Sequence, residues 1–193
     1  MGMARLKILI ESAVTQEMLD WYERRTAKHI RLVQKWAGRI AEFDGAFSDL
    51  PGVAAVHDRL KYDEPERTPY IWITWQYRCK ELGRPFACPV GMRELMNDAT
   101  QHHVLSNPHH PEFWAPVSPG LRDRENRDRV SDLVDATKMS RLALMEMLSD
   151  WCAMSEEKGS DVRDWMDKNI GVRWKFTNDQ VREMERVVGG LGL

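Results

Sequence analysis

Apolar side chains recur every three or four residues along much of the chain, a spacing that places them on one face of an α-helix. The first such stretch runs from Gln16 to about Glu42, with apolar positions at Met18, Leu19, Tyr22, Ile30, Val33, Trp36, Ala37 and Ile40. The segment FDGAFSDLPG then has the composition of a loop, and VAAVHDRLKY predicts a short helical segment that contains His57 and Asp58. The sequence therefore predicts a long amphipathic helix followed by a shorter one.

The central part of the chain contains two more apolar tracts. YIWITWQYRCKEL is rich in β-branched and aromatic residues, which also suit a strand. We favour a helix, because the tract is longer than a typical strand and stops only at Gly83-Arg84-Pro85. CPVGMRELMNDATQHHVL predicts a further helix, and the prolines of SNPHHPEFWAPVSPG predict a loop.

Capping residues mark the last two predicted helices. Ser140 can cap RLALMEMLSDWCAMSEEK, and Gly159 is a plausible terminator. Thr177 and Gln180 form a capping-box pattern for a helix that ends at glycines 189–190. The charged tract LRDRENRDRVSDLVDATKM before Ser140 is expected to be an exposed connection. No strand is expected, so we predict one all-α domain over residues 1–193, with roughly six to eight helices.

Composition and net charge argue against several classes of protein. Hydrophobic residues make up 42% of the chain and the formal net charge is −2, so no nucleic-acid partner is expected. No apolar run is long enough to span a membrane, and the first residues lack the longer apolar core of a signal peptide. The three cysteines show no CxxC spacing and their number is odd. These features predict a cytoplasmic location.

The chemistry suggested by the sequence centres on its histidines. Four of the six histidines fall within QHHVLSNPHHPEFW, and the other two are His29 and His57. Asp58 follows His57 directly, and Glu146 and Asp150 are one helical turn apart on one predicted face. Two acids on one face repel each other unless protons or a cation compensate their charge.

Imidazole nitrogens and carboxylate oxygens together suit divalent first-row metals. A structural zinc site would more often be closed by cysteine thiolates. Only Cys152 lies close to a candidate ligand, and its helical spacing from Asp150 turns it to a different side. We therefore expect a metal site with coordination positions open to water and substrate.

The order His29, His57-Asp58, histidine cluster and Asp150, carried on helices, resembles the HD-domain superfamily of metal-dependent phosphohydrolases. The run HHVLSNPHHPEFW followed by EMLSDW is similar to a family of short bacterial and phage proteins in or beside that superfamily. The resemblance extends from about His29 to Trp165 and implies an HD-like helical bundle with one or two divalent ions (Mn, Fe, Co, Ni, Zn or Mg). It also implies hydrolysis of a phosphoester, with a nucleotide or nucleoside phosphate as substrate and metal-activated water as nucleophile.

The resemblance also implies roles for individual residues. The first metal would be held by His29, His57, Asp58 and Asp150. His103 and His110 would hold a second metal or contact the substrate phosphate, and the choice within each doubled histidine pair stays open. His109 is expected to point away from its neighbour, into an outer hydrogen bond or toward the substrate.

Charged residues near these positions are candidates for catalysis and substrate binding. Lys61 is expected on the same helical face as the His57-Asp58 pair, where it could bind phosphate as a point charge. Lys28 is a second candidate for substrate binding. Asp58 and Lys61 are candidate catalytic residues, and Glu66, or instead Asp63, is a candidate general acid or base. Simple solvation of these charges is the alternative.

Three aromatic and acidic neighbours complete the predictions. Glu112 could steady a histidine. Trp114 and Trp151 are expected to pack in the core, and stacking of one of them on a nucleobase is the alternative. Two other functions stay open: an HD-type di-iron oxygenase, and a non-catalytic protein that binds a metal or ligand. Many HD-type proteins also pair through helices, so a homo-oligomer is a further expectation.

Overall fold

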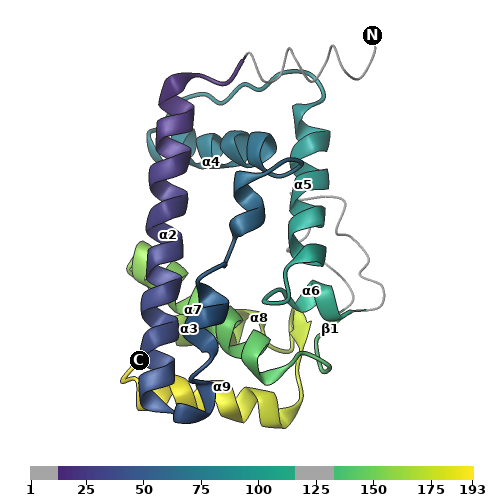
Figure 1. Ribbon diagram of the computed structural model, residues 1–193. Helices are drawn as coiled ribbons and strands as arrows, with labels where there is room; N and C mark the ends of the chain where they lie inside the picture. The colour runs from purple at the N-terminus through teal and green to yellow at the C-terminus, as the bar shows by residue number, and fades with distance from the viewer. Residues whose placement is uncertain (1–12, 116–132) are drawn as a thin grey trace.

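The computed structural model describes residues 13–115 and 133–193, and helices dominate these segments (Figure 1). The elements are α2 (Gln16–Phe43), η1 (Gly45–Phe47), α3 (Leu50–Ala54), η2 (Arg59–Tyr62), α4 (Arg67–Glu81), α5 (Met92–Ser106), α6 (Pro111–Trp114), β1 (Val134–Asp135), α7 (Arg141–Lys158), α8 (Val162–Asn169), β2 (Trp174–Lys175) and α9 (Asn178–Gly190). The prediction of an all-α fold is confirmed, and so is the choice of helix over strand for α4.

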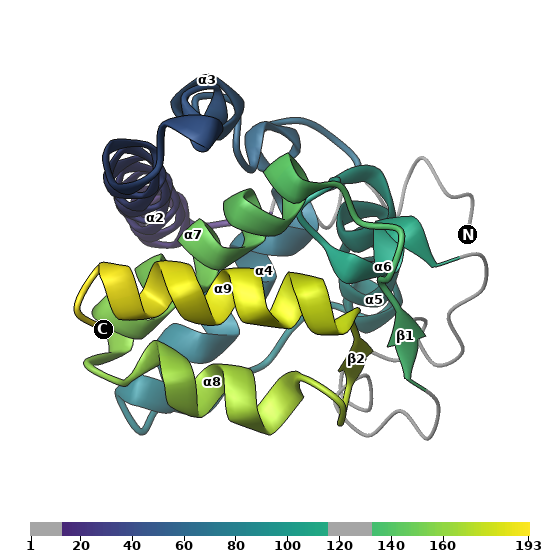
Figure 2. The ribbon, with the colours of Figure 1, turned by 90° about the horizontal axis from the view of Figure 1, so that it is seen from below.

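The long helix α2 connects the two ends of the described structure. It packs against α4 near its start and against α3, α7 and α9 farther along, while α4 also packs on α5 (Figure 1). Seen from below, α9 lies between α7 and α8 (Figure 2). Elements from the beginning and the end of the chain therefore lie side by side.

Two separate apolar clusters explain this arrangement. The larger one joins α2, α7 and α9 through fully buried residues such as Val33, Ile40, Leu148 and Val187. The smaller one joins the start of α2 to α4 and α5 and includes Met18, Tyr22, Ile71, Trp72, Ile73, Met92 and Met96. Along α2, the buried polar residue His29 lies between the positions that contribute to the two clusters. The fold therefore places a polar layer between two apolar ones.

Capping fixes the ends of the helices that carry this layer. The side chain of Ser140 accepts a hydrogen bond from the backbone of Ala143 at the start of α7, and Gly159 ends α7 with φ of +62°. Thr177 and Gln180 form the predicted capping box at the start of α9. A cap of this kind contributes about 1 kcal/mol to helix stability.

Several local predictions were wrong. The short strands β1 and β2 pair in parallel, with Val134 opposite Trp174, although no strand was expected. Helix α8 was not predicted, and α6 lies inside the segment expected to be a loop. Two-residue strands and a four-residue helix are too short to show a periodic pattern. Their contacts with the rest of the fold therefore determine whether they form. Most of the charged tract before Ser140 lies outside the described residues.

Two observations bear on the expected environment of the protein. All three cysteines lie in the described residues and are free thiols. In residues 13–115 and 133–193, every helix is too short or too polar to cross a lipid bilayer.

Candidate metal centre

The predicted metal ligands, together with the neighbouring His109, converge from five separate parts of the fold. His29 comes from α2, the His57-Asp58 pair from the turn after α3, His103 from α5, His109 and His110 from the loop before α6, and Asp150 from α7. The Nε2 atom of His29 lies 3.0 Å from Oδ1 of Asp150. Residues far apart in the sequence therefore meet in the polar layer between the apolar clusters.

Asp58 lies at the centre of this group and is 1% exposed. Its Oδ2 atom lies 3.9 Å from Nε2 of His29 and 3.7 Å from Nε2 of His57. Its Oδ1 atom lies 3.2 Å from Nε2 of His103 and 3.8 Å from Nε2 of His109. The two oxygens of one carboxylate therefore face two different sets of imidazole nitrogens.

The backbone at Asp58 differs from the prediction. Helix α3 ends at Ala54, and Asp58 has φ of +58°, so the His57-Asp58 pair lies in a turn and not in a helix. Among the described residues other than glycine, Asp58 has a positive φ and no other residue does. Aspartate tolerates this left-handed conformation better than most residues, and its cost is offset by the contacts that its side chain makes.

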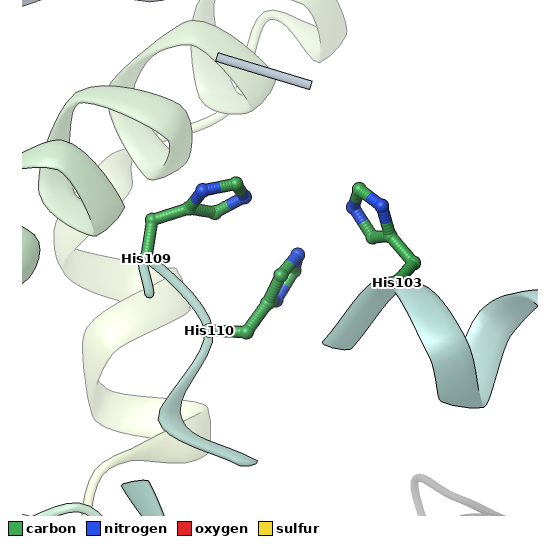
Figure 3. A group of neighbouring side chains, drawn as sticks. All are labelled: His103, His109 and His110. Atoms are coloured by element: carbon green, nitrogen blue, oxygen red, sulfur yellow. The ribbon is translucent and has the colours of Figure 1, made fainter. Parts of the chain in front are cut away.

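Three groups of side chains have ligand atoms close enough to share a metal ion. They are His29, His57 and Asp58; His103, His109 and His110; and His57, His109 and Asp150. In each group the ligand atoms lie within 4.8 Å of one another. Figure 3 shows the rings of His103, His109 and His110 turned toward a common space from α5 and from the loop before α6.

The expectation that His109 points away from His110 is wrong. The two rings have centroids 4.3 Å apart, and the ring of His109 also lies 4.2 Å from that of His57. His109 therefore belongs to both the second and the third group. The loop turns between the two residues in a way that helical or strand periodicity does not describe.

Acidic side chains outside these groups lie beside the Nδ1 atoms of His57, His109 and His29. Nδ1 of His57 lies 3.0 Å and Nδ1 of His109 lies 3.3 Å from the same atom, Oε1 of Glu146. Nδ1 of His29 lies 3.4 Å from Oε2 of Glu157. A carboxylate at Nδ1 favours the tautomer that has its proton there, which leaves Nε2 free as a ligand.

Glu66 lies beside the same nitrogen, Nδ1, in the two histidines of α5. It is fully buried, and its two oxygens lie 2.8 Å from Nδ1 of His102 and 2.8 Å from Nδ1 of His103. Nδ2 of Asn107 also donates a hydrogen bond to the backbone carbonyl of His103. Glu66 thus orients His103, while Asp63, the other candidate acid or base, is exposed.

Several buried nitrogens fit a bound cation. The Nε2 atoms of His57, His109 and His110 have no hydrogen-bond partner in residues 13–115 and 133–193. A buried polar atom without a partner costs about 1–3 kcal/mol, and such atoms are rare in native proteins. A divalent ion held by these nitrogens would satisfy them, so the residues present fit a metal site.

The pKa values of several ionisable groups in the centre differ from their ordinary values. Burial alone would raise the pKa of Asp58, but Lys61, His57 and His103 hold it well below the usual range. Burial alone would lower the pKa of His29, but its hydrogen bonds with Asp150 and Glu157 raise it to about 9. Burial lowers the pKa of His57 and, together with the neighbouring histidines, that of His110. Burial would likewise lower the pKa of His109, but its hydrogen bond with Glu146 and the nearby carboxylates raise it. Ionised carboxylates therefore surround the imidazoles, and protonation of His29 and His109 balances part of the negative charge.

The candidate substrate-binding lysines differ from each other. Lys61 donates a hydrogen bond to Oδ2 of Asp58, and its ammonium lies 5.2 Å from the centre of the Tyr70 ring. The hydroxyl of Tyr22 donates to the backbone carbonyl of Lys61 and so fixes the position of η2. Lys28, by contrast, is exposed on α2. Lys61 therefore belongs to the centre, and Lys28 does not contact the ligands.

The three residues predicted beside the ligands contribute to packing, namely Glu112, Trp114 and Trp151. Oε1 of Glu112 accepts a hydrogen bond from the indole of Trp174, so Glu112 steadies a tryptophan and not a histidine. Trp151 stacks on Trp174 with centroids 5.4 Å apart. Trp114 packs against the edge of the larger apolar cluster and donates to a carbonyl of its own loop.

Part of the outer layer around the ligands was not predicted from the sequence. Glu157 and Asn107 were not predicted, and Glu146 was noted only for its charge beside Asp150. Glu146, Asp150 and Glu157 are spaced by one and then two helical turns, which places them on one face of α7. That spacing was a usable signal for the outer carboxylates.

Comparison with other proteins places the chain in a family. Neither the curated proteins nor the solved structures contain a significant match. A family model described as a family of unknown function (DUF5662) matches residues 18–188 and thus includes the whole candidate metal centre. The chain therefore belongs to the DUF5662 family.

Proposed function

We propose that this protein is an HD-type metal-dependent phosphohydrolase that cleaves a phosphoester, with a nucleotide or nucleoside phosphate as substrate. The main support is the position of Asp58, whose two carboxylate oxygens face separate sets of imidazole nitrogens. A shared carboxylate between two nitrogen-rich positions suits two divalent ions. The order of the ligands along the chain also agrees with the resemblance to the HD-domain superfamily.

The residues divide between two metal positions. His29, His57, Asp58 and Asp150 would hold the first ion, and Asp58, His103, His109 and His110 would hold the second. Nitrogen and oxygen donors of this kind suit Mn, Fe, Co, Ni or Zn, and a carboxylate-rich position also accepts Mg. When bound, such ions lower the pKa of a water molecule toward neutrality and neutralise charge on a phosphoryl group.

Lys61 is the side chain that we assign to the substrate phosphate. Its ammonium interacts with Asp58, and a cation bound to Asp58 would displace it. The backbone of η2 is fixed by the hydroxyl of Tyr22, so the lysine would remain close to the centre after this change. An ammonium there would bind a phosphoryl oxygen as a point charge and stabilise the negative charge of the reacting group.

A phosphate-release screen tests the function. The protein is incubated with nucleotides and nucleoside phosphates, with Mn, Co, Ni, Zn or Mg, alongside the variant Asp58→Asn. We expect phosphate release by the parent protein with at least one metal and none by the variant. Iron in two equivalents with oxygen consumption would instead favour a di-iron oxygenase. No turnover under any condition would favour a binding protein.

A further inference from the structure

We propose that Glu146 is a positioning residue shared by both metal positions, which sets the metal affinity of the two together. This inference rests on the metal centre of the proposed function and extends it to a residue outside the ligand set. Glu146 lies on α7, one turn before Asp150, and is 5% exposed. Its role follows from its contacts with two histidines that we assign to different metal positions.

One oxygen of Glu146 makes both contacts. Oε1 lies 3.0 Å from Nδ1 of His57 and 3.3 Å from Nδ1 of His109. His57 belongs to the group with His29 and Asp58, His109 belongs to the group with His103 and His110, and the third group contains both together with Asp150. We assign His57 to the first metal position and His109 to the second. A single carboxylate therefore touches one imidazole of each metal position.

These contacts fix which nitrogen of each ring is free. An imidazole that donates from Nδ1 to a carboxylate has its lone pair on Nε2. The Nε2 atoms of His57 and His109 are both buried and have no hydrogen-bond partner in the described parts of the chain. Each faces an oxygen of Asp58, at 3.7 Å and 3.8 Å respectively. Glu146 thus aims both free nitrogens at the space on either side of the Asp58 carboxylate.

The other outer carboxylates act on one group each. Glu157 lies beside Nδ1 of His29, which belongs to the first position, and Glu66 lies beside Nδ1 of His103, which belongs to the second. Neither has a contact with a ligand of the opposite group among the ion pairs of the described residues. The three glutamates therefore form a natural comparison, in which Glu146 alone is expected to affect both positions.

The experiment is a zinc titration of the metal-free protein, followed by calorimetry. The variants Glu146→Leu, Glu157→Leu and Glu66→Leu remove the acceptor from each histidine and keep a similar side-chain size. Loss of such an outer hydrogen bond lowers metal affinity about 10- to 100-fold. We expect Glu146→Leu to weaken both binding steps, and the other two variants to weaken one step each. Glu146→Gln keeps an acceptor oxygen and should recover most of the affinity.

A second measurement reads the tautomer directly and needs no metal. Long-range ¹⁵N–¹H spectra of the metal-free parent should show a proton on Nδ1 of both His57 and His109. If Glu146→Leu does not fold, Glu146→Gln serves as the variant for comparison. Two zinc sites in the parent, with only one or neither weakened by substitution at Glu146, would overturn the shared role alone. Rings with a proton on Nε2 and none on Nδ1 would also overturn it. A parent protein that binds no zinc would overturn both this inference and the metal centre.

Discussion

The Nε2 atom of His29 on α2 lies 3.0 Å from Oδ1 of Asp150 on α7. The two helices pack through the larger apolar cluster, and this packing brings the two polar side chains together in the layer next to it. The pKa of Asp150 is held low by its hydrogen bond with His29 and by the charge of that ring, against the effect of burial. The apolar core thus determines where the charged centre forms.

Replacement of Asp58 by asparagine tests the central ligand. Asparagine tolerates the left-handed backbone at this position, so the variant should keep its fold while it loses the negative charge. We expect Asp58→Asn to lose at least one of two bound metal equivalents, measured by elemental analysis after reconstitution and removal of free metal. Asp63→Asn, at an exposed position on the same segment, is the matched control and should bind as the parent does. Full metal content in the Asp58 variant would contradict the assignment.

Metal affinity should rise with pH through the range in which His29 loses its proton. The pKa of His29 is raised to about 9 in the metal-free protein, so a metal ion must displace a proton from it at neutral pH. The same shift stabilises the metal-free fold fully below the unfolded pKa of about 6.5, and this stabilisation is lost as pH rises through about 9. Binding should therefore strengthen, and metal-free stability fall, between these two values.

Calorimetric titrations in buffers of different ionisation enthalpy measure the released protons. At pH near 7.5 we expect proton release on binding, and His29→Gln should reduce the number of protons released. An affinity that is constant from pH 6.5 to 9, without proton release, would show that His29 is not a ligand.

Lys61 should matter for the substrate and not for the metal. Lys61→Gln is expected to keep the metal content and to lower kcat/KM for a phosphoester roughly 10- to 100-fold, because a charge-assisted hydrogen bond contributes about 1.5–3 kcal/mol. Lys28→Gln, at an exposed position beside His29, should leave kcat/KM within about twofold of the parent. Equal effects of the two substitutions would remove the specific role of Lys61.

A core substitution should separate folding from metal binding. Leu148 is fully buried on α7, between Glu146 and Asp150 in sequence, and packs in the larger apolar cluster. Leu148→Ala should lower the free energy of unfolding by about 2–5 kcal/mol, as measured by chemical denaturation of the metal-free protein. The fraction that remains folded should bind the same number of metal ions. Loss of metal from a variant that is still fully folded would show that the packing of Leu148 also positions the ligands on α7.

The sequence predicted the helices well because their signals are local. Periodic apolar positions marked α2, the length of its apolar tract favoured a helix for α4, and the caps at Ser140 and Thr177 marked the starts of α7 and α9. The strands β1 and β2 were missed because each has two residues and forms only through pairing with the other. Local pattern thus predicts long elements and not short ones that depend on distant contacts.

The site residues also divide into those that the sequence predicts and those that depend on the fold. Residue type and order were sufficient to select His29, Asp58 and Asp150, which meet in the structure. The turn at Asp58 and the inward direction of His109 were not predicted, because a positive φ and a loop conformation depend on the surrounding fold. The contacts of Glu146 were likewise not predicted, since they join α7 to a turn and a loop from distant parts of the chain. Only the spacing of Glu146, Asp150 and Glu157 on one face of α7 could be read from the sequence.

Elemental analysis of the purified protein tests the metal centre most directly. The protein is expressed without a tag that binds metals, dialysed against buffer without chelator and compared with Asp58→Asn prepared in the same way. We predict close to two equivalents of a divalent first-row metal in the parent and a clear loss in the variant. Metal contents at background level in both proteins, even after incubation with Mn, Co, Ni, Zn and Fe, would contradict the account.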